Sequence, residues 1–309
     1  MVVSAEPGII GILVVNYFSA AAVGALLRSL ANHAGDCTVH VAVVDNSCSA
    51  AEFDELNDVV KGQASPQLLV RVAACPTNLG YAGGNNFAWS LLSEVASTIE
   101  VVVVANPDVE VTAGSLAELT RAVREQPNTL FGVSTVTGGI SYSGLGAINR
   151  RSGQSRQVAL AEPPTPAELA YPTGHFLVTP RRLWEQLDGL SEDYFLYSEE
   201  IDLVLRARED DRSTVIGTMD ALSLQHSGGL TTGSGDSLAE KSMATYLHGT
   251  RSRIILFRKH ADLKRYAPLI VTARLLWSLR VLGVAGYPSA KAVWSGVAQG
   301  LLWRAGAKE

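Results

Sequence analysis

The chain has 309 residues, of which 47% are apolar and 18% charged, and a formal net charge of -5 at pH 7. This length accommodates one large domain with an appendage or two modest domains, and the apolar content excludes wholesale disorder. The negative balance argues against a general nucleic-acid-binding protein, which needs a basic face. Three cysteines without CxxC spacing favour a reducing compartment over a disulfide framework.

The first seven residues lack the basic region of a signal peptide. The apolar run that follows ends at Asn16, far short of the length of a membrane span, and is better explained as a buried strand. No later segment is interpreted as long and apolar enough to cross a bilayer. We therefore expect a cytoplasmic protein.

The first half of the chain alternates short β-branched runs with helical patterns. Strands are predicted at residues 9–15, 39–44, 68–72 and 101–104, and helices at residues 20–30, 51–60 and 85–95. Continuous apolar runs are typical of strands buried on both faces, so we expect an α/β fold with a doubly wound, mostly parallel, Rossmann-like sheet. Ligands bind such sheets outside the carboxyl ends of the strands. Asn16, Asp45 and the turn at residues 106–108 lie at those ends.

The pattern changes beyond Phe131. Residues 138–157 are rich in Gly, Ser and Arg and are predicted to form a loop. A strand is expected at 171–179, helices at 181–187 and 199–209, and, after a Gly/Thr/Ser loop that reaches Ser237, a mostly helical tail. We predict one domain at residues 1–237, with two halves at about 1–135 and 136–237. A helical C-terminal extension covers residues 238–309.

The turn at residues 106–108 directly follows the valine strand. A carboxylate at Asp108 points into the crevice, where it can ligate a divalent cation that also holds a diphosphate. The alternative is an Asx-Pro turn in which Asp108 caps the next helix. The turn alone does not decide between these interpretations.

Two adjacent carboxylates, Glu199 and Glu200, begin a predicted helix after an aromatic segment. A helix N-terminus stabilises an ionised carboxylate, which suits a base that takes a proton from an acceptor hydroxyl. Alternatively, these are ordinary acidic residues of a first helical turn. Asp202 precedes Arg206 by one turn, and we expect a surface pair or a structural role for it.

Two further segments indicate a function only when they are considered together with Asp108, Glu199 and Glu200. His226, at the end of a predicted strand, is either a metal ligand that completes a site with Asp108 or a structural histidine. Residues 78–86 join a strand to a helix, and their glycines allow the backbone to approach an anion closely. This segment does not match GxGxxG, which counts against a dehydrogenase.

Taken together and in this order, these segments resemble the family 2 glycosyltransferases, and within them the bacterial rhamnosyltransferase-like branch. The resemblance covers nearly the whole chain up to a helix near residue 260. Each motif is loose, but their order and context are specific. The segments that carry the resemblance are residues 14–17, 43–47, 78–86, 106–108, 199–203, 223–229 and 250–260.

The resemblance implies a GT-A fold and an inverting glycosyltransferase that uses Mg²⁺ or Mn²⁺. Residues 1–237 would then be the catalytic domain, with a nucleotide-sugar half at about 1–135 and an acceptor half at 136–237. Asp108 would be the metal-binding end of the DXD motif, with Asn106 at its first position, and His226 would be the later metal-site histidine. Glu200 would be the general base, preceded by Glu199. The residues expected to contact the donor are Asn16, Asp45, Asn78, Gly80, Gly83, Asn85, Asn106 and Asp108, with Asp45 at the nucleoside.

The branch favours transfer of L-rhamnose from dTDP-rhamnose, while UDP-sugars such as galactose or N-acetylglucosamine stay open as donors. The acceptor would be a hydroxyl of a glycan, a glycolipid or a small molecule, as in cell-wall or polysaccharide biosynthesis. Two departures from the family affect the site. Glu200 stands where the family usually has aspartate, so Glu199 stays open as the base. Ser191 stands where the family often has a carboxylate, which leaves acceptor recognition open.

The tail at residues 266–303 is apolar with scattered basic residues. Its tryptophans could anchor it at a membrane that presents a lipid-linked acceptor. Packing on the catalytic domain or on a second subunit is favoured instead, because small residues and a proline interrupt any long amphipathic face. The tryptophans are Trp277, Trp294 and Trp303, and the interruptions are Gly283, Gly286 and Pro288.

Two other function classes fit part of the pattern. A non-catalytic nucleotide-sugar-binding module would keep Asp45 and Asp108 but has no use for the adjacent carboxylates at 199–200. A sugar-1-phosphate nucleotidyltransferase needs a glycine-rich basic loop after the first strand, where this chain reads residues 16–20 without glycine or basic side chains.

Overall fold

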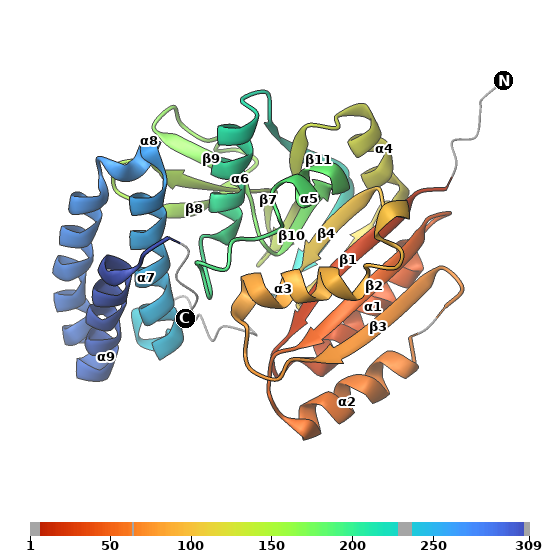
Figure 1. Ribbon diagram of the computed structural model, residues 1–309, viewed down its shortest axis with the longest axis horizontal. Coiled ribbons are helices and arrows are strands. Elements are labelled where there is room, and N and C mark those ends of the chain that lie inside the picture. The colour runs from red at the N-terminus through yellow and green to blue at the C-terminus, as the bar shows by residue number, and fades with distance from the viewer. Residues whose placement is uncertain (1–6, 64, 228–236, 306–309) are drawn as a thin grey trace.

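The computed structural model describes residues 7–63, 65–227 and 237–305 (Figure 1). The strands are β1 (Ile9–Asn16), β2 (Thr38–Asp45), β3 (Leu68–Ala74), β4 (Val101–Ala105), β5 (Val109–Ala113), β6 (Thr129–Thr137), β7 (Ile140–Asn149), β8 (Ser155–Ala159), β9 (Glu168–Pro172), β10 (Phe176–Pro180) and β11 (Val215–His226). The helices are α1 (Ala20–His33), α2 (Ala50–Lys61), α3 (Gly80–Leu91), α4 (Ala117–Glu125), α5 (Arg181–Gln186), α6 (Glu199–Asp210), α7 (Met243–Lys259), α8 (Ala261–Lys264) and α9 (Ala267–Leu302), with short 3-10 turns at Ala96–Thr98 and Leu238–Glu240.

One sheet runs through the molecule in the order β3-β2-β1-β4-β10-β6-β11-β5. The first four strands are mutually parallel, and β10 is antiparallel to both of its neighbours, β4 and β6. Strand β11 is parallel to β6, and β5 closes that edge antiparallel to β11. The mixed but mostly parallel α/β sheet confirms the predicted fold class.

Helices cover both faces of the sheet, because neighbouring residues of each buried strand face opposite ways. Ile12 and Val14 of β1 pack with α1, α2 and α4 in one core, whereas Leu13 packs with α3, α5 and α6 in the other. Figure 1 shows α1 and α2 on one side of β1–β3 and α3 on the other. The carboxyl ends of the parallel strands therefore meet at one edge of the sheet, where open α/β sheets form their ligand crevice.

The loop predicted at residues 138–157 was wrong. Strands β7 and β8 occupy most of it, and β7 pairs with β6, β8 and β9. Gly138 and Gly139 both have positive φ, at 56° and 78°, and make the tight turn from β6 into β7. The glycines and serines therefore mark a hairpin instead of an irregular loop.

Two other segment boundaries differ from expectation. The strand predicted at 171–179 is two strands, β9 and β10, separated by Thr173, Gly174 and His175. The helix predicted from residue 85 begins at Gly80 instead. The small residues that follow Gly80 let the start of α3 lie close against β1. At Gly84 the approach is so close that an added methyl group would be 2.8 Å from Val15 Cγ2.

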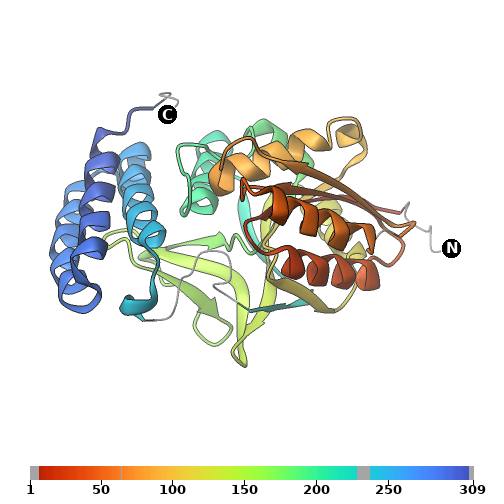
Figure 2. The ribbon, with the colours of Figure 1, turned by 90° about the horizontal axis from the view of Figure 1, so that it is seen from below.

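The C-terminal helices stand together at one end of the molecule (Figure 2). Helix α9 is two helical limbs joined at Gly286, whose φ of 81° and ψ of 176° are not helical, with Pro288 just beyond. Ile254 and Phe257 of α7 belong to the same core as α3 and α6, so this end packs directly on the α/β unit. The domain boundary at residue 237 stays a prediction, and the loop expected after His226 lies almost wholly outside the described residues.

Contrary to the sequence interpretation, one described helix, α9, is long and apolar enough to cross a membrane. An 18-residue window has a mean hydropathy of 1.5, and 17% of it is buried. One such helix is weak evidence, since the core helix of a soluble protein passes the same test. Membrane contact and pairing with a second subunit both stay predictions.

Candidate active site

The carboxyl ends of β1 and β2 meet as expected. Asn16 and Asp45 are paired in register, and Asn16 Nδ2 donates to Asp45 Oδ1 at 3.0 Å and to Glu52 Oε1 at 2.9 Å. Asp45 is 1% exposed and also accepts hydrogen bonds from the backbone and hydroxyl of Ser47. Both side chains are therefore buried and hydrogen-bonded to each other at the carboxyl ends of their strands. Contact between Asp45 and a nucleoside stays a prediction.

The N-terminus of α3 lies beside these residues. Asn46 Nδ2 donates to the carbonyl of Gly80 at 2.7 Å, and Gly80 has a φ of 70°. A methyl group there would lie 2.3 Å from the carbonyl oxygen of Phe195, so only glycine fits this close approach to the loop before α6. The segment 78–86 thus connects the carboxyl end of β2 to the segment that carries Glu199 and Glu200.

The other polar residues of this segment point in different directions. Asn78 is exposed, and its Oδ1 accepts the N–H of Gly80 at 2.9 Å. Gly83 faces Leu79 and Glu192. Asn85 is fully buried and donates to the carbonyl of Tyr81 within α3. Their contact with a donor stays a prediction.

Asp108 and His226 lie together at the end of β11. His226 Nε2 is 3.3 Å from Asp108 Oδ1, and the backbone N–H of Ser227 donates to the Asp108 carbonyl at 3.1 Å. Nδ1 of His226 is buried and has no hydrogen-bond partner among the described residues. The structure therefore brings together the two residues expected to hold a metal ion.

His175 was missed by the sequence interpretation and supports this pair. Its ring stacks on that of His226, with centroids 4.8 Å apart and planes 16° apart, and its Nε2 lies 2.8 Å from the hydroxyl of Thr135. Burial, together with the charge of His226, lowers the pKa of His175 to about 3. The ring is therefore neutral and packs His226 in place.

Tyr81, also missed, joins the metal side of the crevice to the carboxylate side. Its hydroxyl oxygen lies 2.6 Å from the carbonyl of Gly174 and 3.1 Å from Asn106 Oδ1. Burial and the negative charges of Glu200, Glu199 and Asp108 raise the pKa of Tyr81 well above its usual value. Three carboxylates from two separate segments therefore act on one protonated phenol.

Glu199 and Glu200 begin α6 after a strained turn. Tyr197 and Ser198 both have positive φ, at 73° and 76°, a conformation rare for residues other than glycine. The turn places Glu200 at the crevice: a methyl group on Gly174 would lie 3.8 Å from Glu200 Oε1 and 3.4 Å from the Tyr81 hydroxyl. Consecutive strained residues at such a point are typical of a functional site.

The two carboxylates differ in surroundings. Glu199 is 2% exposed, and its pKa is raised well above the usual range by burial and by the charge of Glu200. Burial also raises the pKa of Glu200, while the positive charge of Arg253 acts against this rise. Glu200, and not Glu199, lines a cavity of about 330 Å³. Of the two, Glu200 is the one that faces the cavity.

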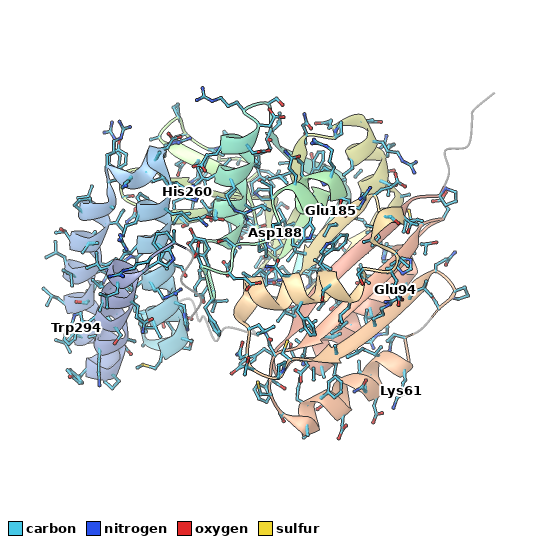
Figure 3. The ribbon with its side chains drawn as sticks, in the orientation of Figure 1. Lys61, Glu94, Glu185, Asp188, His260 and Trp294 are labelled. Carbon is cyan, nitrogen blue, oxygen red and sulfur yellow. The ribbon has the colours of Figure 1, made fainter. Side chains whose placement is uncertain are left out.

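Asp202 is not the surface pair that the sequence suggested. It is fully buried and bonded to Arg206 Nε at 2.6 Å, His260 Nε2 at 2.8 Å, Lys259 Nζ at 2.9 Å and the Tyr194 hydroxyl at 3.1 Å. His260 is the residue just before α8 and bonds to α6 through Asp202 (Figure 3). The structural role expected as the alternative is confirmed: Asp202 ties α6 to α7 and α8.

Ser191, where the family often has a carboxylate, belongs to a local network. Its hydroxyl donates to Asp193 Oδ2 at 3.1 Å and accepts from Lys259 Nζ at 2.9 Å. Asp193 also accepts from the indole N–H of Trp303 at 3.0 Å. These contacts hold the C-terminal helices against the loop before α6.

No known family profile matches the chain, and no curated protein matches it by sequence. Solved structures do match. GalNAc-T7 with UDP, GalNAc and Mn²⁺ superposes with a TM-score of 0.53 at 12% identity, over 79% of this chain and 48% of that one, so this chain spans about half of GalNAc-T7. TarS from S. aureus in complex with UDP gives 0.52 at 13% identity, over 94% and 88% of the two chains. The mannosyltransferase PcManGT from Pyrobaculum calidifontis with GDP-Man and Mn²⁺ gives 0.51 at 12% identity, over 96% and 76%.

The chain has a GT-A fold. This confirms the fold that the resemblance implied. At such low identities the likeness concerns the fold, and function has to be argued from the site.

Proposed function

We propose that this chain is an inverting, metal-dependent glycosyltransferase that moves a sugar from a nucleoside diphosphate to an acceptor hydroxyl. The observation that carries the proposal is the convergence around Tyr81. One side of its hydroxyl faces Asn106, two residues before Asp108, and the other faces Gly174, next to Glu200. A candidate donor-phosphate site and a candidate base thus flank one reaction space. Three structures with the same fold were solved with UDP or GDP-Man, two of them with Mn²⁺.

Asp108 and His226 fit a divalent cation such as Mg²⁺ or Mn²⁺. Carboxylate oxygens suit both ions, and the buried Nδ1 of His226 has no other partner among the described residues. No group of three or more His, Cys, Asp or Glu side chains in the described part of the chain is arranged to hold a metal, so diphosphate and water would complete the coordination. When bound, the ion would supply Lewis-acid stabilisation of the charge on the leaving nucleoside diphosphate.

Glu200 is the proposed general base. It takes the proton of the acceptor hydroxyl as that oxygen attacks the anomeric carbon, on the face opposite the leaving nucleoside diphosphate. One C–O bond forms while the bond to the phosphate oxygen breaks, so a single displacement inverts the configuration. The raised pKa of Glu200 suits this role, because a base works best when its pKa lies near the working pH.

The hydroxyl of Tyr81 stays protonated and holds Asn106 and Gly174 in place around the reacting atoms. Positioning of the two substrates accounts for a large part of the rate in such a mechanism. The proposed donor is dTDP-L-rhamnose, and UDP- and GDP-sugars are the next candidates.

Release of nucleoside diphosphate from this donor panel, with Mg²⁺, with Mn²⁺ or with EDTA, tests the proposal. We expect release from one donor, only with metal, and its loss in Asp108→Asn. Glu110→Gln, on the exposed side of β5, is the control and should behave as wild type. Metal-dependent nucleotide binding without release from any donor, across an acceptor panel, would show a binding module instead.

A further inference from the structure

The cavity beside Glu200 is bounded by α6, α7, the first limb of α9 and the β8–β9 region. Its volume is about 330 Å³. It adjoins a second cavity of about 510 Å³ that shares Ser155, Arg253 and Arg274 as lining residues. Neither Asp108 nor His226 lines either cavity. The two cavities are therefore separate from the candidate metal site, and the first of them borders the candidate base Glu200.

Two guanidinium groups face this space without a matching set of carboxylates. Nε and Nη1 of Arg253 are shielded from solvent and make no hydrogen bond with any described residue. Arg274 shares both cavities with Arg253, and burial together with the charge of Arg253 lowers the pKa of Arg274 to about 10. Lys241 adds a third cation to the wall.

The negative groups nearby do not balance these cations. Glu168 lines the second cavity but is bonded through both oxygens to Arg156. Glu200 is the carboxylate that lines the first cavity, and its charge is needed at the reacting hydroxyl. Two buried guanidinium nitrogens without hydrogen-bond partners are unfavourable unless a ligand supplies those partners. The cavity is therefore built for an anion.

We propose that this cavity binds an acceptor that carries a phosphate group, with Arg253 and Arg274 holding the phosphate while a sugar hydroxyl meets Glu200; this rests on the proposed glycosyltransferase function. The planar fork of a guanidinium matches the oxygens of a phosphate and can bind two of them at once. Aromatic side chains complete the walls and give a sugar ring flat apolar surfaces to lie against. They are Tyr171, Tyr197 and Trp277. The centroid of the Trp277 ring lies 5.2 Å from the guanidinium carbon of Arg274.

Binding of defined probes to the full chain tests the proposal. The probes are N-acetylglucosamine 1-phosphate, its neutral methyl glycoside and farnesyl phosphate, each titrated by calorimetry without donor or metal. We expect the phosphate probes to bind at least tenfold more tightly than the methyl glycoside. Preference for the sugar phosphate indicates a soluble acceptor and preference for farnesyl phosphate a lipid-linked one; both support the phosphate site.

Three variants make the test specific. Arg253→Gln and Arg274→Gln should each weaken phosphate binding about 10–100-fold, as expected for a lost charge-assisted hydrogen bond. Arg280→Gln, on an exposed turn of the same helix as Arg274, is the control and should bind as wild type. Metal-dependent binding of the nucleoside diphosphate should be unchanged in all three, which shows that they are folded.

Two results separate this proposal from the proposed function. If the phosphate probes bind no more tightly than the methyl glycoside, while donor binding persists, the anion site is refuted and the glycosyltransferase function stands. If Arg253→Gln and Arg274→Gln bind phosphate like wild type, the site lies elsewhere and the assignment is wrong.

Discussion

Replacement of Asp202 by asparagine should destabilise the protein strongly. The carboxylate is fully buried and faces Arg206, Lys259 and His260, with bonds of 2.6–2.9 Å. An amide of the same shape leaves these cations without their counter-charge, and breaking a buried ion pair in this way costs about 3–5 kcal/mol. For a chain of this size the loss corresponds to a decrease in Tm of roughly 6–10 °C.

The loss of stability in Asp202→Asn should depend on pH, and the shifted pKa values of Asp202 and His260 set its direction. Although burial acts to raise the pKa of Asp202, its bonds to the surrounding cations lower it overall, so its contribution is present above about pH 4 and is lost on acidification. Burial acts to lower the pKa of His260, but bonds to Asp202 and Glu209 raise it overall. That contribution is full below about pH 6.5 and is lost as the pH rises through the raised pKa.

Urea unfolding of wild type and Asp202→Asn at pH 5.5 and pH 9 measures both effects. Asp58→Asn is the matched control, because Asp58 pairs with Lys61 at an exposed site on α2, far from α6 (Figure 3). Exposed pairs contribute between zero and about 1 kcal/mol. Equal losses in the two variants, or a loss for Asp202→Asn that does not shrink at pH 9, would refute the reasoning.

Four further changes test the site and its surroundings. Removal of divalent metal with EDTA should abolish turnover, and His226→Ala should need more Mn²⁺ than wild type for half-maximal rate in a metal titration. Gly80→Ala should lower stability by about 1–3 kcal/mol in thermal melts, because its methyl group would meet the Phe195 carbonyl at a positive φ. Tyr81→Phe should lower kcat by up to about tenfold in steady-state assays, the value of one hydrogen bond, with the fold retained.

The sequence predicted the parallel half of the sheet well, because buried strands such as β4 have no polar residue to confuse the pattern. It also predicted that Asp108 and His226 belong to one site. The two residues are 118 positions apart in the chain, and the structure places His226 Nε2 3.3 Å from Asp108 Oδ1. The order of the motifs, more than any single one, carried that prediction. The hairpin of β7 and β8 escaped it, since glycine turns and a glycine-rich loop have the same composition.

The remaining features depend on contacts that local patterns do not contain. Arg206, one turn after Asp202, suggested a surface pair, whereas burial of Asp202 follows from Lys259 and His260 more than fifty residues later. Likewise, Arg253 and Arg274 lie on different helices and become a pair only when α9 packs on α7. Tyr81 could have been found from its place in the segment 78–86, since an aromatic hydroxyl is unusual in a glycine-rich helix start.

The most direct test of the central claim compares wild type with Glu200→Gln. The rate of nucleoside diphosphate release with Mn²⁺ and the Kd of the nucleoside diphosphate are measured for both, with Glu185→Gln on the outside of α5 as control (Figure 3). If Glu200 is the general base, kcat of Glu200→Gln is about 10²–10⁴-fold lower than that of wild type, while the Kd is unchanged and the control behaves as wild type. Wild-type turnover in Glu200→Gln, or loss of turnover in Glu199→Gln alone, would contradict it.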